Sequence, residues 1–257
     1  MESDAAASRI RRAPPAFVHA VVQSATDRSP RLRRVVLAGP GLAALAAAGP
    51  ATSVRVLLPD DDGALVMPTW TGNEFLLPSG ERPVIRTLTP QPGDLGDDSL
   101  AVDVVLHADG PAVRWARGVR PGDAVAVSGP GRVDPLERDA RSYLLGGDES
   151  ALPAIEQILA WLSPTTEVDV LIEVAEPSAV IDLPSHPRAH VTWIVTEPGV
   201  PAGHMLPPTV EALAALPERI WLAGEAAAIQ RLRRHLFEDR AVARTAVVAR
   251  GYWKHPR

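Results

Sequence analysis

Three glycine turns that precede helical segments are the parts of this sequence best suited to binding an anion. They lie at Asp109–Ala112, Gly146–Pro153 and Trp221–Glu225. The amide groups at the beginning of a helix lack partners within the helix, and together with the macrodipole they favour a negatively charged ligand such as phosphate. Glycine permits the tight turn, and proline suits the first turn of a helix. Together the three turns indicate a protein that handles nucleotides.

The composition excludes several other kinds of chemistry. The 257 residues contain no cysteine, which excludes disulfides, thiolate nucleophiles, cysteine-ligated zinc and cysteine-held iron–sulfur clusters. The seven histidines are scattered without the spacing of metal ligands, so we expect no metal site. Lys254 is the only lysine among the 26 basic residues, and the other basic residues are arginines. The formal net charge is −5, and we expect no nucleic-acid partner.

The first half of the chain has the pattern of a β-rich domain. Short apolar segments are separated by clusters of proline, glycine and aspartate, with room for two short helices. The expected strands are Phe17–Val22, Leu32–Leu37, Ser53–Leu58, Val84–Leu88, Leu100–Leu106 and Ala124–Val127, and the expected helices are Leu42–Ala48 and Ala112–Arg117. Six short strands with almost no helical period predict an antiparallel barrel.

The second half alternates between strands and helices. The expected strands are Tyr143–Leu145, Val168–Val174, His190–Val195, Ile220–Ala223 and Thr245–Ala249, and the expected helices are Ala151–Leu162, Thr209–Leu216 and Ala226–Phe237. This alternation predicts an open parallel sheet covered by helices on both faces. A polar linker at Asp134–Arg141 divides the chain, so we predict one domain of residues 1–136 and another of residues 137–257.

One segment of the first half imitates a dinucleotide-binding fingerprint. Val35–Ala44 reads as a strand, a G-x-G-x-x-A turn and a helix, and Asp60 follows about twenty residues later. A parallel β–α–β unit needs a connection of roughly a dozen residues, most of them helical. Here only Leu42–Ala48 can be helical before Gly49-Pro50 ends the segment. Antiparallel pairing of the next strand is therefore the better interpretation, and the Rossmann reading remains the weaker alternative.

The ends of the chain and its apolar stretches predict a protein that neither is secreted nor inserts into a membrane. The N-terminus has two acidic residues before its first arginine and no apolar core, unlike a secretory signal. The uncharged stretch from Val35 to Val54 contains three glycines and two prolines, which a membrane helix would not tolerate. We expect a cytoplasmic protein that acts as a monomer.

Motifs spread over both halves make the sequence recognisable. They are Arg86-Thr87-Leu88-Thr89, His107–Pro111, Trp115-Ala116, Gly122-Asp123, Gly129-Pro130, Gly147–Ile155, Ala223-Gly224-Glu225 and Arg250–Lys254. In this order they resemble the siderophore-interacting protein family, whose members are FAD-dependent ferric-siderophore reductases with a ferredoxin-reductase-like architecture. The resemblance runs from about Phe17 to Lys254.

The resemblance implies an NAD(P)H-dependent flavoprotein that reduces ferric siderophores and releases ferrous iron. FAD would bind the barrel of residues 1–136, and NAD(P)H would bind the α/β domain of residues 137–257. On the flavin side the implied residues are Arg86, Thr87, Leu88, Thr89, His107, Gly110, Pro111, Trp115 and Ala116. On the nucleotide side they are Asp148, Glu149, Ser150, Gly224 and Glu225, while Tyr252 and Trp253 approach the flavin from the C-terminus. The flavin would supply the redox chemistry, so no catalytic side chain is expected.

The implied substrate is a ferric siderophore, which is commonly an anionic small molecule. A cationic entrance would raise its capture. The candidates for this entrance are Arg132, Arg250 and Lys254. Which siderophore is used, and whether NADPH or NADH is preferred, does not follow from the sequence.

Two residues depart from the pattern that the family usually shows. Leu88 stands where a tyrosine is usual, and Gln91 stands where a second arginine is usual. Loss of a ring that stacks on the flavin and of a charge-assisted hydrogen bond would weaken FAD binding by about one to three powers of ten. Two alternatives therefore stay open, which are a flavin-deficient siderophore-binding or accessory protein and a general flavin reductase or diaphorase.

Overall fold

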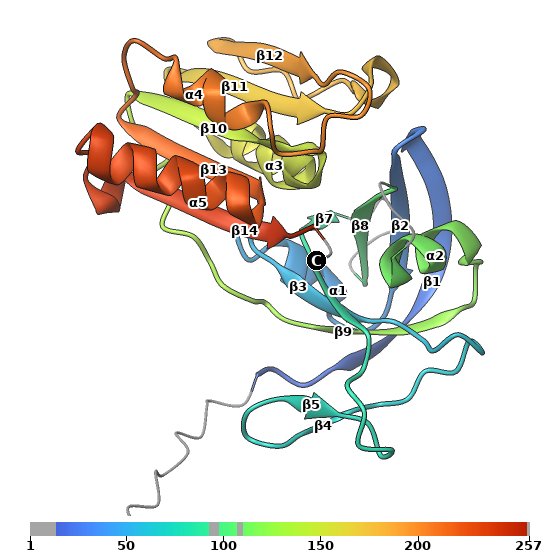
Figure 1. Ribbon diagram of the computed structural model, residues 1–257. Coiled ribbons are helices and arrows are strands. Elements are labelled where there is room, and N and C mark those ends of the chain that lie inside the picture. Colours follow the sequence, from blue (N-terminus) through green and yellow to red (C-terminus); the bar gives the residue numbers. More distant parts are fainter. Residues whose placement is uncertain (1–13, 93–97, 107–109, 256–257) are drawn as a thin grey trace, which may run out of the picture.

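The computed structural model describes residues 14–92, 98–106 and 110–255, and it places the two halves of the chain in separate β-structures (Figure 1). The N-terminal half forms a seven-stranded antiparallel sheet with the order β6-β3-β9-β1-β2-β8-β7. Its strands are β1 Val18–Ser29, β2 Leu32–Ala38, β3 Val54–Leu57, β6 Ile85–Leu88, β7 Pro90–Pro92, β8 Ser99–Val105 and β9 Ala124–Ser128. Only Thr89 separates β6 from β7, the two ends of this order, so the sheet curls round into a barrel.

All six strands expected in the first half are present, and the barrel has one strand more. The additional strand, β7, lies in a Pro-Gln-Pro segment that reads as a turn in the sequence. Proline cannot donate to a strand ladder, but an edge strand tolerates it, and β7 stands at the end of the sheet order. The connection between β3 and β6 also carries a small hairpin of β4 (Thr69–Trp70) and β5 (Phe75–Leu76).

The apparent dinucleotide fingerprint is not a β–α–β unit. The helix α1 covers only Leu42–Ala46, and both neighbours of β2 in the sheet, β1 and β8, are antiparallel to it. The second expected helix is present as α2, Pro111–Gly118, which packs on the barrel. The antiparallel interpretation of this segment is confirmed.

The C-terminal half forms a five-stranded parallel sheet with the order β12-β11-β10-β13-β14. Its strands are β10 Ser142–Asp148, β11 Glu167–Val174, β12 Ala189–Val195, β13 Arg219–Glu225 and β14 Val247–Trp253. The helices are α3 Leu152–Trp161, α4 Leu206–Glu211 and α5 Ala226–Arg234. The chain leaves the central strand β10 toward β11 and later returns to its other side at β13, so the order reverses between β10 and β13. In open α/β sheets, ligands bind at the carboxyl edge at such a reversal.

Several boundaries in the second half differ from the sequence-based prediction: β10 extends to Asp148, α4 ends at Glu211 and α5 ends at Arg234. Two further differences bear directly on the site. The helix expected at Thr209–Leu216 begins earlier, at Leu206, because the carboxylate of Glu173 accepts hydrogen bonds from the amides of Met205 and Leu206. The last strand extends four residues beyond the expected Ala249, so Tyr252 and Trp253 belong to β14.

The core of the α/β half continues into the barrel. A cluster built on α3 and the parallel sheet includes Leu32 at the start of β2 and Ala51 before β3. A second apolar cluster lies under α4 and α5, and a third fills the barrel. The shared cluster means that the two halves are packed against each other. Among the described residues, no helix is both long and apolar enough to cross a lipid bilayer.

Glycine at the end of β10 is required by packing. A methyl group on Gly147 would collide with the Ala151 side chain and would come within 2.5 Å of the Ala223 carbonyl oxygen. On Gly118, at the end of α2, a methyl group would meet no atom within 4 Å.

We therefore predict that Gly147→Ala lowers the free energy of unfolding by at least about 2 kcal/mol, because β10, β13 and α3 must all shift to admit the methyl group. Chemical denaturation measures the loss. Gly118→Ala is the matched control and should change stability by less than about 0.5 kcal/mol. Equal effects of the two substitutions would show that the close packing at Gly147 is not required.

Candidate cofactor and substrate site

Asp148, the last residue of β10, joins three segments at the carboxyl edge of the parallel sheet. Its Oδ1 accepts hydrogen bonds from the amide of Ser150 at 2.9 Å and from the Ser150 hydroxyl at 2.5 Å. Its Oδ2 accepts from the amide of Glu225 at 2.7 Å and from the indole Nε1 of Trp253 at 2.9 Å. Burial raises the pKa of Asp148, while the hydrogen bonds from Ser150 and Trp253 oppose that rise. The turn after β10, the end of β13 and the end of β14 are thus held by one side chain.

Two further carboxylates cap the helices that begin at this edge. Glu173, near the end of β11, accepts from the amides of Gly203 at 2.7 Å and Leu206 at 2.8 Å. Burial raises the pKa of Glu173. Glu225 accepts from the amide of Ala228 at 2.8 Å and so caps α5. Several helix-terminal amides therefore already have intramolecular partners, and a bound dinucleotide would have to use other groups of the edge.

A pocket opens at the same edge and is lined by residues of both halves. Asp148, Ser150, Val174 and Trp253 contribute from the α/β half, and Val105 contributes from the end of β8 in the barrel. Trp253 forms one wall, and its ring lies 4.7 Å from that of His255. The pocket is small, and most of its exposed lining is apolar.

Glu149, which the sequence assigns to the nucleotide turn, forms an ion pair with the barrel. Its carboxylate accepts from Arg31 Nε at 2.7 Å and from Arg31 Nη2 at 2.8 Å. It also accepts from the amide of Ala175 at 3.2 Å. The Glu149 side chain is buried and also borders the pocket. Its main contact is therefore with the other half of the chain.

Arg86 on β6 is a partly buried cation without an acidic partner in the described part of the chain. Its Nη1 donates only to the carbonyl of the neighbouring Ile85, at 2.9 Å. Burial alone lowers the pKa of Arg86, and no carboxylate opposes it. A guanidinium in this state is suited to an anionic ligand.

The residues that follow Arg86 approach the C-terminal segment in space. Thr87 is exposed, Leu88 packs against the barrel core and Thr89 is buried. The Thr89 side chain interacts with the hydroxyl of Tyr252, whose ring centroid lies 6.4 Å from that of Trp221. The structure thus brings Thr89 and Tyr252 together, and it places Trp253 against Asp148.

The turn before α2 offers a second group of open positions in the barrel. Gly110 is the N-cap residue of α2, and a methyl group there would meet no atom within 4 Å. Pro111 begins the helix, and Ala116 is buried in it. The indole Nε1 of Trp115 is buried and has no hydrogen-bond partner among the described residues. His107, the remaining candidate of this motif, lies outside the described residues.

The three candidate substrate cations differ in their surroundings. Arg250 donates from Nη2 to the buried carboxylate of Asp134 at 2.5 Å, and its Nε lies 3.1 Å from the same oxygen. Its charge is therefore balanced within the protein. Arg132 and Lys254 are exposed, and no ion pair to either is seen in the described part of the chain. These two are the cations available to an incoming anion.

Sequence reasoning missed Arg28, Arg31 and Gln157, which join the two halves, and Glu173, which caps α4 within the α/β half. A charged residue that ends an otherwise apolar strand was a usable signal for Glu173. The arginines of the β1–β2 hairpin carry no comparable signal, because their partners lie more than one hundred residues away.

Comparison with known proteins matches both halves of the chain to family models. Residues 21–134 match a siderophore-interacting FAD-binding domain, and residues 140–256 match a siderophore-interacting protein domain. The ferric vibriobactin reductase ViuB of Vibrio cholerae is 30% identical over 88% of this chain and 85% of its own length. An NADPH-dependent ferric-chelate reductase of Escherichia coli is 28% identical over 86% of each chain.

Comparison with solved structures also matches this chain to a siderophore-interacting protein. The siderophore-interacting protein SipS from Aeromonas hydrophila is 31% identical, with a TM-score of 0.77 over 95% of this chain and 93% of its own. A ferredoxin NADP⁺ reductase from Neisseria gonorrhoeae, at 13% identity, has a TM-score of 0.64 over 92% of this chain and 99% of its own. The latter similarity concerns the fold alone and confirms the ferredoxin-reductase-like architecture.

The bond from Trp253 to Asp148 leads to a pH-dependent prediction. The folded-state pKa of Asp148 is raised, so the folded protein binds more protons than the unfolded chain between the ordinary and the raised pKa. The free energy of unfolding therefore falls as pH rises through that window. Trp253→Phe removes a donor to the ionised carboxylate, so it should raise this pKa further and deepen the fall.

We expect the stability deficit of Trp253→Phe to be larger at about pH 8 than at about pH 5, by about 1 kcal/mol or more. Urea unfolding of both proteins at the two pH values measures it. Loss of ring packing contributes equally at both pH values and cancels in the difference. A deficit independent of pH would contradict the role of the indole N–H.

Proposed function

Because the chain belongs to the siderophore-interacting protein family, we propose that it is an FAD-dependent oxidoreductase that passes electrons from NAD(P)H to ferric siderophores and so releases ferrous iron. The observation that carries this proposal is the small pocket at the carboxyl edge of the parallel sheet, which is lined by Val105 of the barrel and by Asp148 and Trp253 of the other half. The two halves thus meet at the ends of β10 and β14. Two cofactor-binding halves must meet in this way if electrons are to cross between them.

The barrel residues fit FAD. Arg86 supplies a partly buried cation without an acidic partner among the described residues, which suits a flavin phosphate. The indole N–H of Trp115, which has no hydrogen-bond partner in the described part of the chain, and the open turn at Gly110 would offer a donor and space for the rest of the dinucleotide. Leu88 and Thr89 would line the ring side. When bound, FAD supplies the redox chemistry, since a flavin accepts a hydride and releases electrons singly.

NAD(P)H is the proposed reductant, and the carboxyl edge of the parallel sheet is its proposed site. The order of the strands reverses there, and a small pocket opens at this edge beside Ser150 and Trp253. Glu225 and Gly224 border the same edge through their bonds and contacts with Asp148. The carboxylates at this edge all accept hydrogen bonds, and Glu149 is paired with Arg31, so their repulsion of an anionic dinucleotide is partly offset.

The protein would act on the ferric siderophore through position and charge. Lys254 follows Trp253 directly, and Arg132 follows the Gly129-Pro130-Gly131 turn. Exposed cations raise the local concentration of an anionic substrate. Reduction weakens the hold of hard oxygen ligands on iron, so the metal is cargo and not a resident cofactor. We further propose a division into domains 1–136 and 137–257 and action as a cytoplasmic monomer, since NAD(P)H is an intracellular reductant.

The first test measures FAD affinity. Arg86→Met should weaken FAD binding by at least about tenfold, because it removes a charge-assisted bond of about 1.5–3 kcal/mol. Leu88→Tyr should tighten binding, because it adds a ring that can stack on the flavin. Titration of FAD-free protein, followed by flavin fluorescence, measures both effects. Wild-type protein that takes up no FAD would favour a flavin-deficient binding or accessory protein and refute the oxidoreductase.

The second test concerns the acceptor. Lys254→Ala should raise KM for an anionic ferric siderophore about two- to tenfold through weaker electrostatic capture, and it should leave NAD(P)H oxidation by ferricyanide nearly intact. Arg141→Ala removes an exposed cation just before β10, at the opposite edge of the sheet, and is the matched control.

Equal losses with both acceptors would refute an acceptor-binding role of Lys254. Wild-type protein that reduces ferricyanide but no ferric siderophore would favour a general flavin reductase.

A further inference from the structure

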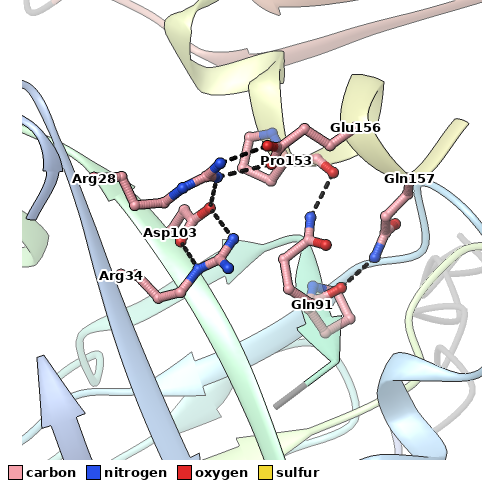
Figure 2. A network of polar contacts seen from close by, with 8 residues as sticks. Arg28, Arg34, Gln91, Asp103, Pro153, Glu156 and Gln157 are labelled. Atoms are coloured by element: carbon pink, nitrogen blue, oxygen red, sulfur yellow. Dashed lines mark hydrogen bonds and ion pairs between the residues drawn. The ribbon is translucent and has the colours of Figure 1, made fainter. Parts of the chain in front are cut away.

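Two glutamines connect β7 of the barrel to α3 of the α/β half. The Nε2 of Gln91 donates to the carbonyl oxygen of Pro153 at 2.5 Å, and both groups are buried. In the opposite direction, the Nε2 of Gln157 donates to the carbonyl oxygen of Pro90 (Figure 2). We call this pair of contacts the reciprocal glutamine bridge. Each side chain binds a backbone carbonyl of the other element, so a shift of either element breaks both bonds.

The ends of the bridge are held rigidly. Gln91 lies between two prolines, whose rings fix the backbone, and it pairs with Ala101 of β8. The Oε1 of Gln157 accepts from the amide of Ala51 at 2.9 Å, so this side chain has a second contact with the barrel. Neither glutamine can follow a displaced partner without losing another contact. The bridge therefore fixes the position of β7 relative to α3.

Two arginines of the β1–β2 hairpin form ion pairs next to this bridge, and each binds a carboxylate through two of its nitrogens. Arg28 binds both oxygens of Glu156, the residue before Gln157, at 2.8 Å and 2.5 Å. It also binds Asp103, which Arg34 binds in turn at 2.7 Å and 2.8 Å (Figure 2). Two-pronged bonds of this kind fix direction as well as distance. The apolar cluster shared by the two halves holds them together, but hydrophobic contact has no preferred direction. The polar contacts therefore set the orientation of one half relative to the other.

The reciprocal glutamine bridge lies next to both proposed cofactor sites. β7 begins one residue after Thr89, the end of the flavin-side strand. α3 begins directly after Ala151, two residues after Ser150 of the proposed nucleotide turn. The bridge thus fixes the two segments that would carry donor and acceptor. Reactions between bound partners are sensitive to such placement, and a displacement of about 1 Å can cost about a hundredfold in rate.

We propose that Gln91 is a positioning residue, which through the reciprocal glutamine bridge aligns the NAD(P)H site with the flavin for hydride transfer. This inference rests on the proposed function. Gln91 has its side-chain amide directed at the carbonyl oxygen of Pro153 in the other half. Its role is therefore between the halves, and it acts through α3 without a contact to the reacting atoms.

The test separates the two half-reactions of Gln91→Leu, which keeps the size of the side chain and removes the bond. Rapid mixing with saturating NAD(P)H measures flavin reduction, and mixing of photoreduced protein with a ferric chelate measures reoxidation. We expect reduction to slow by about 10- to 100-fold, because only this step needs the two halves aligned, while reoxidation stays unchanged. Gln157→Leu removes the other half of the bridge and should give the same result.

Thr166→Val is the matched control. It removes a buried hydroxyl-to-carbonyl bond, from Thr166 to Ala140 at 2.8 Å, away from the contacts of β7 with α3. It should lower the melting temperature to a similar extent and leave both half-reactions unchanged. A merely structural role of Gln91 predicts the same behaviour for Gln91→Leu, and that outcome would overturn the proposal.

A second readout does not depend on turnover. Because the chain has no cysteine, spin labels can be attached cleanly at Arg120→Cys in the barrel and His190→Cys on β12, both at exposed positions. The distance distribution between the labels in FAD-free protein should broaden with Gln91→Leu and stay narrow with Thr166→Val.

The results that overturn the inference are distinct from those that overturn the function. An unchanged distribution, an unchanged reduction rate, or an equal slowing of both half-reactions would each refute alignment by Gln91. A wild-type protein that binds FAD but accepts no electrons from NAD(P)H would refute the proposed function and this inference with it.

Discussion

The carboxylate of Asp148 is the constraint on which the arrangement of the candidate site depends. It is buried, its pKa is raised by burial, and its two oxygens accept four hydrogen bonds from the turn after β10, from β13 and from β14. Removal of any donor would leave charge less compensated in a buried place, which is costly. The position of the C-terminal strand β14 beside the barrel is therefore fixed by a group at the end of β10, the central strand of the same parallel sheet.

This use of carboxylates changes how the parallel sheet can bind a nucleotide. Helix N-termini at the carboxyl edge usually offer unpaired amides to phosphate. Here Glu173 and Glu225 accept from amides at the beginnings of α4 and α5, and Asp148 accepts from the amide of Ser150. The edge is consequently stable without a ligand. A dinucleotide bound at this edge would therefore gain less from these amides than is usual in open α/β sheets.

The sequence predicted those features that local patterns encode. Alternation of strands and turns identified six barrel strands, and apolar periodicity identified α3 and α5. It missed β7, because the prolines around Gln91 read as a turn while an edge strand tolerates them. It misplaced the start of α4, because the cap comes from Glu173, about thirty residues earlier in the chain. The role of Glu149 was likewise out of reach, since its partner Arg31 lies in the other half.

The excess of arginine over lysine has a structural consequence at the boundary between the halves, whatever its origin. Arg28, Arg31 and Arg34 each bind a carboxylate through two nitrogens. A lysine at any of these positions would supply a point charge that tolerates rotation about the contact, whereas the guanidinium fork does not. Two of these forks, from Arg28 to Glu156 and from Arg31 to Glu149, cross the boundary and restrict the α/β half to one orientation, while the fork from Arg34 fixes Asp103 within the barrel. An enzyme that transfers electrons across such a boundary needs this restriction more than it needs additional binding energy, because apolar contact alone would let one half slide on the other.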